Sequence, residues 1–289
     1  MNRRWIPLMV LVGALAAGRG VSEDNAAAPK EVRDPTQVFT ERMIVVKGQG
    51  VAPSDRPLSP GQKEIMALRA AKVVALRELA EILSGVRVSG ETCIQDAAAR
   101  SDQIKATVNG LIKGAEVVHE SYDDHKEVAI VYLRLGLDGP SGLTQTLLPE
   151  IIEQKVAGGP APPQYAPPEP PPAASTTEAA DALIIDATGK NLRPALINRV
   201  VVNNGNVLFE PSKIPPEILA KKGCGDYTSD LGKAKAIAAS HGAKHPLVIK
   251  AAGVMRSTDA QVSEADAAVI FTENKRTNFL EGAQVVFVL

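Results

Sequence analysis

A proline-rich stretch interrupts the chain between residues 157 and 180 and constrains the fold more than any other feature. Eight of its residues are proline, and most of the others are alanine, glycine, serine or threonine. Such a segment has little apolar surface to bury, and its prolines donate no backbone hydrogen bonds. We therefore expect a semi-rigid spacer between two domains, residues 38–139 and 181–289. A role as a ligand for proline-binding modules is the weaker alternative.

A long amphipathic helix is the centre of the first predicted domain. Ser59 is suited to the N-cap, Pro60 to the first helical position and Gln62 to a capping box. The helix should run from Pro60 to Ser84, with Gly85 as a left-handed stop. Its buried stripe should consist of apolar residues at spacings of 3, 4, 4 and 3: Leu68, Ala71, Ala75, Leu79 and Ile82.

The rest of this domain is predicted as strands around a second, shorter helix. A strand at 43–46 runs into Gly48 and Gly50, and another spans 86–92. Residues 94–110 suit the shorter helix, and two strands, 115–122 and 127–137, are joined by a tight turn. The pattern predicts an antiparallel sheet packed on one long and one shorter helix. Residues 140–156 leave room for a further short helix at 143–152.

The last of these strands is apolar on both faces. Ala129, Val131, Leu133 and Leu135 point one way, and Val128, Ile130 and Tyr132 the other. Helices can cover only one face, so a second helix or a neighbouring subunit should cover the other. We therefore predict an assembly surface at Val128, Ile130 and Tyr132.

The second domain mixes strands and helices. Strands are expected at 182–187, 199–202, 206–209, 247–251 and 284–289, and helices at 230–240 and 263–276. This pattern predicts a mixed α/β domain, so the whole chain is assigned to the α+β class with two domains.

The N-terminus has the features of an export signal. Residues 1–18 combine Arg3 and Arg4, an apolar run and an Ala14-Leu15-Ala16 cleavage site. A membrane anchor that is not cleaved is the alternative. No later apolar run is long enough to span a membrane. No cysteine lies near the cleavage point to carry a lipid. Residues 19–37 are expected to form a flexible lead-in.

The two cysteines leave two alternatives open. In an oxidising compartment Cys93 and Cys224 could pair and join the domains, but two separate buried thiols are the favoured interpretation.

The sequence contains no complete catalytic, cofactor or metal motif. Gly48 and Gly50 lack the remaining residues of a dinucleotide or phosphate loop, so a tight turn or a close backbone approach is favoured. The histidines are not completed into a metal cluster, and no nucleophile or base accompanies Asp186. A net charge of −1 and 3% aromatic residues argue against nucleic-acid binding. We therefore predict a protein that is not an enzyme and has no cofactor.

Several motifs resemble one family of bacterial envelope proteins. They are Gly48-Gln49-Gly50-Val51-Ala52-Pro53, Arg69-Ala70-Ala71, Gly85-Val86-Arg87-Val88 and the Val108 to Ala115 stretch with its two glycines. Over residues 42–137 they resemble the lipoprotein family named after a twenty-kilodalton surface lipoprotein, which includes the flagellar outer-membrane protein FlgP and the N-terminal domain of FlgT. The segment from Leu183 to Leu196 is similar to a C-terminal domain that accompanies such proteins.

This resemblance implies a structural role and no catalytic residues. We expect an exported envelope protein, periplasmic or held at the outer membrane by partners, that assembles with itself or with a machine such as the flagellar motor. The alternative is a periplasmic module that binds a small ligand or glycan in a polar pocket formed by Asp186, Arg193 and Asn198.

Overall fold

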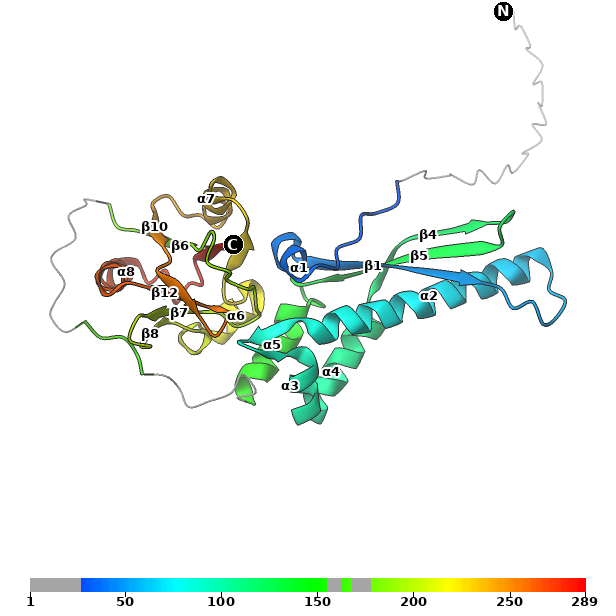
Figure 1. Ribbon diagram of the computed structural model, residues 1–289, viewed down its shortest axis with the longest axis horizontal. Coiled ribbons are helices and arrows are strands. Elements are labelled where there is room, and N and C mark those ends of the chain that lie inside the picture. The colour runs from blue at the N-terminus through cyan, green and yellow to red at the C-terminus, as the bar shows by residue number, and fades with distance from the viewer. Residues whose placement is uncertain (1–26, 155–162, 168–177) are drawn as a thin grey trace, which may run out of the picture.

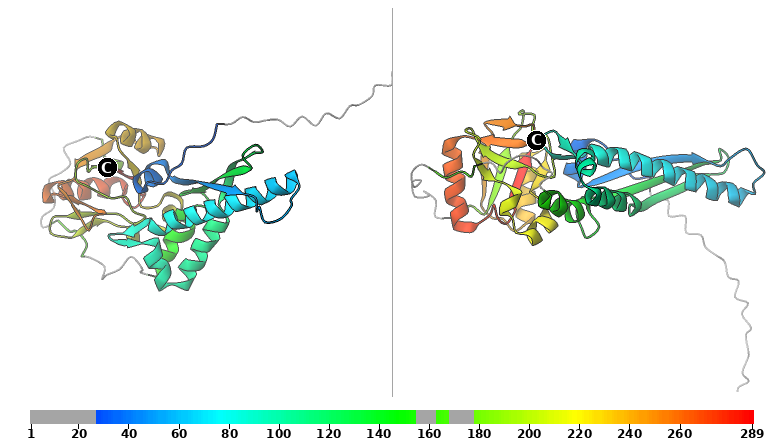
Figure 2. Two further views of the ribbon diagram at one scale, coloured as in Figure 1. Left: turned by 45° about the vertical axis from the view of Figure 1, so that its right-hand side comes forward. Right: turned by 90° about the horizontal axis from the view of Figure 1, so that it is seen from below.

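The computed structural model describes residues 27–154, 163–167 and 178–289, and it shows an elongated molecule (Figure 1). A long helix and a narrow sheet of the first domain project away from the compact second domain (Figure 2). The predicted export signal and most of the proline-rich stretch lie outside the described residues. The two-domain α+β class is confirmed.

The sheet of the first domain has three antiparallel strands. They are β1 (Met43–Val51), β4 (Glu116–Asp123) and β5 (Val128–Gly136), with β5 in the middle. The predicted hairpin turn is present, because the Asp123 carboxylate accepts hydrogen bonds from the backbone amides of His125 and Lys126, both at 3.1 Å. This turn fixes the register of β4 against β5.

The long helix, α2 (Pro60–Gly85), begins as predicted. The Ser59 side chain accepts from the Gln62 amide, and the Gln62 side chain accepts from the Ser59 amide. The buried stripe repeats strictly every four residues, at Ala67, Ala71, Ala75, Leu79 and Leu83, so Leu68 and Ile82 lie only at its margin. The predicted left-handed stop is wrong: Gly85 is the last helical residue, and Val86 follows it in extended conformation.

Small residues let α2 lie directly against β1. A Cβ atom added to Gly48 would lie 2.1 Å from the Ala71 carbonyl oxygen, and one added to Gly50 would lie 2.2 Å from the Ala71 amide nitrogen. The close backbone approach is therefore confirmed, whereas the tight turn is wrong because β1 continues through both glycines to Val51. We call the unit formed by α2 and the three strands the arm.

Three further expectations for the first domain are corrected. The lead-in contains α1 (Pro35–Glu41), which Asp34 caps and which buries Val38 and Phe39. The strand predicted at 86–92 is a hairpin of β2 (Arg87–Ser89) and β3 (Thr92–Cys93), because Gly90 turns the chain at a φ of 57°.

The helix predicted at 94–110 is divided into α3 (Ile94–Arg100) and α4 (Asp102–Lys113), because Ser101 is extended and caps α4. The expected short helix is α5 (Leu143–Glu153).

The second domain contains two four-stranded sheets. The first is parallel, in the order β10 (Pro246–Lys250), β6 (Ala182–Asp186), β13 (Val285–Val288) and β9 (Asp226–Thr228), with α7 (Leu231–Ser240) on one face. The second has the order β11 (Gly253–Met255), β12 (Asp259–Val262), β7 (Arg199–Val202) and β8 (Val207–Phe209). Helices α6 (Pro216–Lys222) and α8 (Glu264–Thr277) complete the mixed α/β domain that the sequence predicts.

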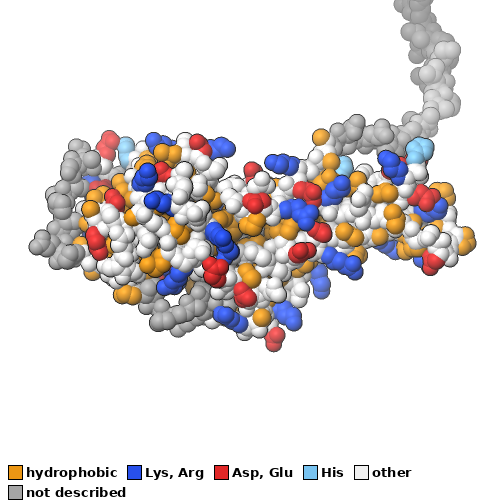
Figure 3. All heavy atoms as spheres, in the orientation of Figure 1, with side chains coloured by type: hydrophobic (Ala, Val, Ile, Leu, Met, Phe, Trp, Pro, Cys, Tyr) orange, Lys and Arg blue, Asp and Glu red, His pale blue; other side chains and the backbone are white. Residues whose placement is uncertain are grey.

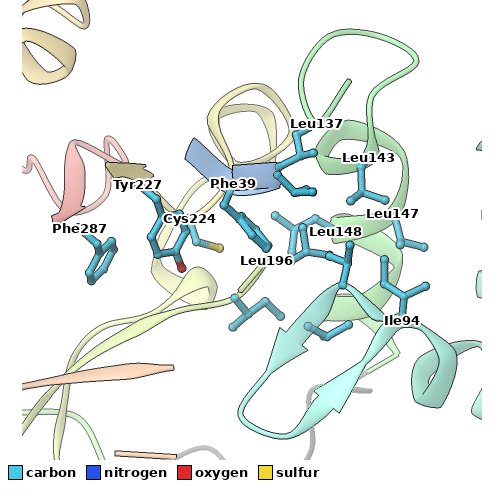
Figure 4. Close-up of a cluster of buried hydrophobic side chains, with 14 of the residues drawn as sticks. Phe39, Ile94, Leu137, Leu143, Leu147, Leu148, Leu196, Cys224, Tyr227 and Phe287 are labelled. Atoms are coloured by element: carbon cyan, nitrogen blue, oxygen red, sulfur yellow. The ribbon is translucent and has the colours of Figure 1, made fainter. Parts of the chain in front are cut away.

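The two domains share one hydrophobic core (Figure 4). Phe39 of α1 lies edge-on to Tyr227 of β9, with ring centroids 5.4 Å apart, and α5 packs on α6. The β2–β3 hairpin adds backbone bonds, from the Leu196 amide to the Arg87 carbonyl oxygen at 3.0 Å and from Ile197 to Val88 at 2.8 Å. The domains are therefore docked directly on each other, and most of the spacer predicted between them lies outside the described residues.

Part of the proline-rich stretch also joins the core. Tyr165 is only 6% exposed and packs against the second domain. The expectation that this stretch has little apolar surface to bury does not hold at Tyr165, because its aromatic side chain supplies the apolar surface that its neighbours lack.

Candidate assembly surface

The glycines of β1 decide which residues point away from α2. Gly48 and Gly50 face the helix. Because side chains alternate along a strand, Lys47, Gln49 and Val51 lie on the opposite face. Antiparallel register pairs these three residues with Tyr132, Ile130 and Val128, respectively. The predicted assembly residues therefore share the face of the sheet opposite α2, which we call the outer face.

The accessible part of the outer face lies towards the tip of the arm. Val51 is 61% exposed, and Val128 and Ile130 are half-buried. Tyr132 is only 8% exposed, and its ring packs edge-on to His119 with centroids 5.7 Å apart. It is therefore packed within the domain and offers little surface to a partner. Sequence reasoning missed Val51 because the expected strand ended before the glycines. The arm also carries hydrophobic side chains among charges of both signs on the face that Figure 3 shows.

The free edge of β1 borders this surface. Nearer the second domain, Val32 pairs with Val45 through two backbone hydrogen bonds, and the Glu31 carboxylate accepts from the Lys47 amide. From Gln49 to Val51, no strand of the described residues pairs with the edge of β1 that faces away from β5. Backbone groups at such an edge can pair with another chain. The opposite edge strand, β4, is broken by a register shift between Val117 and His119 and carries more charge.

Two hollows lie at the end of the outer face nearer the second domain, and a third lies between α1 and the second domain. A hollow of about 310 Å³ is lined by Val32, Val45 and Val118, among others. Next to it, one of about 450 Å³ shares Met43 and Arg134 with it. A third, of about 430 Å³, lies between the end of α1 and α7 and is lined by side chains that include Lys233 and Ile237. Both apolar and charged side chains line each of the three.

A charged cluster fixes the arm to the second domain. Arg42 binds Asp138 of its own domain, and its Nη1 lies 2.9 Å from the Asp226 carboxylate. The Nδ1 atom of His241 lies 3.5 Å from the other Asp226 oxygen. Burial raises the pKa of Asp226, against the opposing charges of Arg42 and His241. Burial alone would lower the pKa of Arg42, but Asp138 and Asp226 together raise it.

The three residues of the predicted polar pocket have separate surroundings. Asp186 ends β6 and accepts the Thr188 amide at 3.0 Å, and bonding to Thr188 lowers its pKa. The Arg193 side chain is exposed, and its backbone amide donates to the Ser257 carbonyl oxygen. Asn198 is 1% exposed and lies beside Tyr227 in the shared core. The three hollows around α1 are lined by other residues.

The cysteines are unpaired, and the described histidines belong to no group that could hold a metal ion. Cys93 and Cys224 are free thiols, but the expectation that both are buried is wrong for Cys93, which is half-buried. Burial raises the pKa of Cys224. Within the described ranges, His, Cys, Asp and Glu side chains form no group of three that could hold a metal ion.

Comparison with known protein families identifies a relative of the second domain. Residues 182–289 match a family model described as the second domain of Treponema pallidum Tp0624. None of the curated proteins with which the chain was compared matches it. The match leaves out residues 42–137, so the resemblance of the first domain to the envelope lipoprotein family stays a prediction. Every helix within residues 27–154, 163–167 and 178–289 is too short or too polar to cross a bilayer.

Proposed function

We propose that the chain is an exported, non-enzymatic protein of the cell envelope that assembles through the outer face of the arm. Its partner is a second copy or another envelope protein. The observation that carries the proposal is the apolar row of Val51, Val128 and Ile130 beside an open strand edge. Apolar side chains beside unpaired backbone groups favour association with another chain. The export signal and the envelope resemblance of residues 42–137 are the reasons for placing it in the envelope.

The construction of the arm suits a structural role. Helix α2 has 26 residues and is therefore about 39 Å long. Its direct backbone contact with β1 and the capping box at Ser59 make the arm rigid, and the shared core and Arg42 fix its base. A rigid projection can present its outer face to a neighbour at a constant distance.

Asp186, the carboxylate that most suggests catalysis, accepts a hydrogen bond within the fold. A general acid needs a raised pKa, whereas bonding to Thr188 lowers the pKa of Asp186. Asp186 therefore stabilises the turn after β6, which supports a role in the fold.

A matched pair of lysine substitutions tests the proposal. Val51→Lys places a charge on the outer face, and Val73→Lys places the same charge on α2, where Val73 is 47% exposed. The mature wild-type chain should form oligomers in native mass spectrometry as its concentration rises. Val51→Lys should prevent this because burying an unpaired ammonium group is costly, and Val73→Lys should not.

Photo-crosslinking in cells covers the case of a different partner. A photoreactive residue at position 51 should capture a copy or an envelope protein, and the same residue at position 73 should capture neither. A monomer at every concentration, together with equal crosslinking from both positions, would refute the proposal.

A further inference from the structure

Residues 163–167 lie along the edge of the second domain as an added strand. Gln164 pairs in parallel with Val207 of β8, the edge strand of its sheet. The Val207 amide donates to the Pro163 carbonyl oxygen at 2.8 Å, and the Tyr165 amide donates to the Val207 carbonyl oxygen at 2.9 Å. In Figure 1 this segment appears between the two grey traces, near β8. The chain therefore binds a piece of itself as an extended peptide.

An aromatic contact holds the centre of this segment. The Tyr165 ring is edge-on to Phe271 of α8, with centroids 6.0 Å apart. The Nζ atom of Lys275 lies 4.5 Å from the centroid of the Phe271 ring. Burial raises the pKa of Tyr165, and the charge of Glu264 adds to the effect. The site therefore accepts a tyrosine side chain and keeps it neutral.

A polar contact precedes the aromatic one. The Gln164 side-chain amide donates to the Glu210 carboxylate at 2.7 Å. Glu210 is 6% exposed and faces Arg199, whose Nε lies 3.6 Å away. Two backbone bonds, one aromatic side chain and one amide are the elements by which sheet edges recognise short extended peptides.

The segment is bound by few groups. Of residues 163–167 only Tyr165 is buried, while Pro163, Gln164 and Ala166 are exposed. The flanking prolines favour an extended backbone before binding, which lowers the entropy cost of docking. Few contacts would therefore have to break for an identical segment to take its place.

Chain lengths outside the described residues allow exchange between molecules. Residues 155–162 connect the segment to α5, and residues 168–177 connect it to the second domain. Fully extended, these connections can span about 30 Å and 36 Å, respectively. Exchange of identical segments preserves every contact, which is the general basis of domain swapping.

We infer that the edge of β8, with Phe271 and Glu210, is a docking groove for an extended Pro-Gln-Tyr segment, and that a second copy supplies residues 163–167 in an assembly. In isolated chains the groove is filled by the molecule's own segment, whose effective concentration is high. Exchange of residues 163–167 between copies rests on the proposed function in one respect: assembly through the arm brings the copies close together.

A peptide-binding experiment tests the groove. The full chain carrying Tyr165→Ala has an intact groove but a defective segment of its own. A fluorescent peptide of residues 161–169 should bind this variant, and a peptide with alanine in place of the tyrosine should bind at least about tenfold more weakly. Wild-type protein should bind the peptide weakly because its groove is filled. Equal binding of both peptides, or no binding by the Tyr165→Ala chain, would overturn the groove.

Mixing two variants tests the second copy as the occupant. The Tyr165→Ala chain offers a groove, and a Phe271→Ala chain offers a segment but a defective groove. The mixture should form pairs in native mass spectrometry that neither variant forms alone. Both chains also carry Val51→Lys, which prevents association through the outer face of the arm. Any mixed pair must therefore form through the groove. Circular dichroism checks folding, and Phe271→Leu replaces Phe271→Ala if the latter is unfolded. Absence of mixed pairs would overturn the assignment of the second copy.

Discussion

Gly48 of β1 lies directly beneath the Ala71 carbonyl oxygen of α2, so close that an added methyl group would lie 2.1 Å from it. The neighbouring atoms that such a group would meet include the Ala75 amide nitrogen at 2.4 Å, which also belongs to the backbone. Backbone atoms cannot move aside as a flexible side chain would. The distance between strand and helix is therefore set by the absence of a side chain at this position.

Gly48→Ala should therefore destabilise the first domain. Overpacking of this kind lowers the free energy of unfolding by about 1–3 kcal/mol, and contact with backbone atoms places Gly48→Ala at the upper end. Urea denaturation followed by circular dichroism measures the effect. The matched control is Gly61→Ala, at the start of α2, where an added Cβ meets nothing within 4 Å. It should leave stability unchanged or raise it by up to about 1 kcal/mol. Equal effects of the two substitutions would contradict the close-approach argument.

Local signals in the sequence predicted much of the arm. The cap at Ser59 and the turn at Asp123 depend on side chains within three residues, so single-sequence reasoning finds them. Alternation in β5 placed Val128 and Ile130 on one face correctly. The length of β1 was missed because glycine is disfavoured inside strands, and here both glycines are required by the close approach of α2.

Long-range packing could not be predicted from the same signals. Phe39 and Tyr227 are far apart in sequence, and neither belongs to a pattern that points to the other. The docking of Tyr165 was hidden by the prolines around it, although a single tyrosine in such a segment was an available signal. The docking of the domains therefore became visible only in three dimensions.

Arg42 should contribute more to stability than an exposed arginine does. Arg42→Gln leaves Asp226, which is 7% exposed, without its closest cation. We expect the free energy of unfolding at neutral pH to fall by about 2 kcal/mol. Arg33→Gln is the control, because the ion pair of Arg33 with Glu78 is largely exposed and should contribute less than about 1 kcal/mol.

A double-mutant cycle separates the ion pair from other effects of Arg42→Gln. Asp226→Asn removes the buried charge, so combining it with Arg42→Gln should cost less than the sum of the two single effects, by at least about 0.5 kcal/mol. Strict additivity would show that Arg42 and Asp226 do not interact across the domain boundary.

Cutting the connection should leave the two domains associated. A protease site introduced within residues 168–177 divides the chain, but the shared core and the backbone bonds of Leu196 and Ile197 remain. The two fragments should elute together in gel filtration at micromolar concentration. Phe39→Ala removes a side chain that is 3% exposed and contacts Tyr227, so it should weaken the association markedly. Fragments that separate fully without this substitution would contradict direct docking.

The buried carboxylate of Asp259 should make stability depend on pH in a specific direction. Asp259 is 2% exposed, and burial raises its pKa although Arg199 and Arg256 oppose the shift. An acid with a raised pKa in the folded state binds its proton more tightly there than in the unfolded chain. Its contribution to stability is therefore present below the ordinary aspartate pKa of about 3.9, and it is lost as pH rises through the raised folded value.

Asp259→Asn removes this dependence because asparagine does not ionise. The free energy of unfolding of the variant relative to wild type should therefore rise as pH increases above about 4, as urea titrations at several pH values would show. Asp123→Asn is a control of opposite sign. Bonding to Lys126 lowers the pKa of Asp123, so this variant should lose stability relative to wild type as pH rises towards about 4, and the difference should then stay constant. A flat difference for Asp259→Asn, or the same slope for both variants, would show that burial of Asp259 does not control its ionisation.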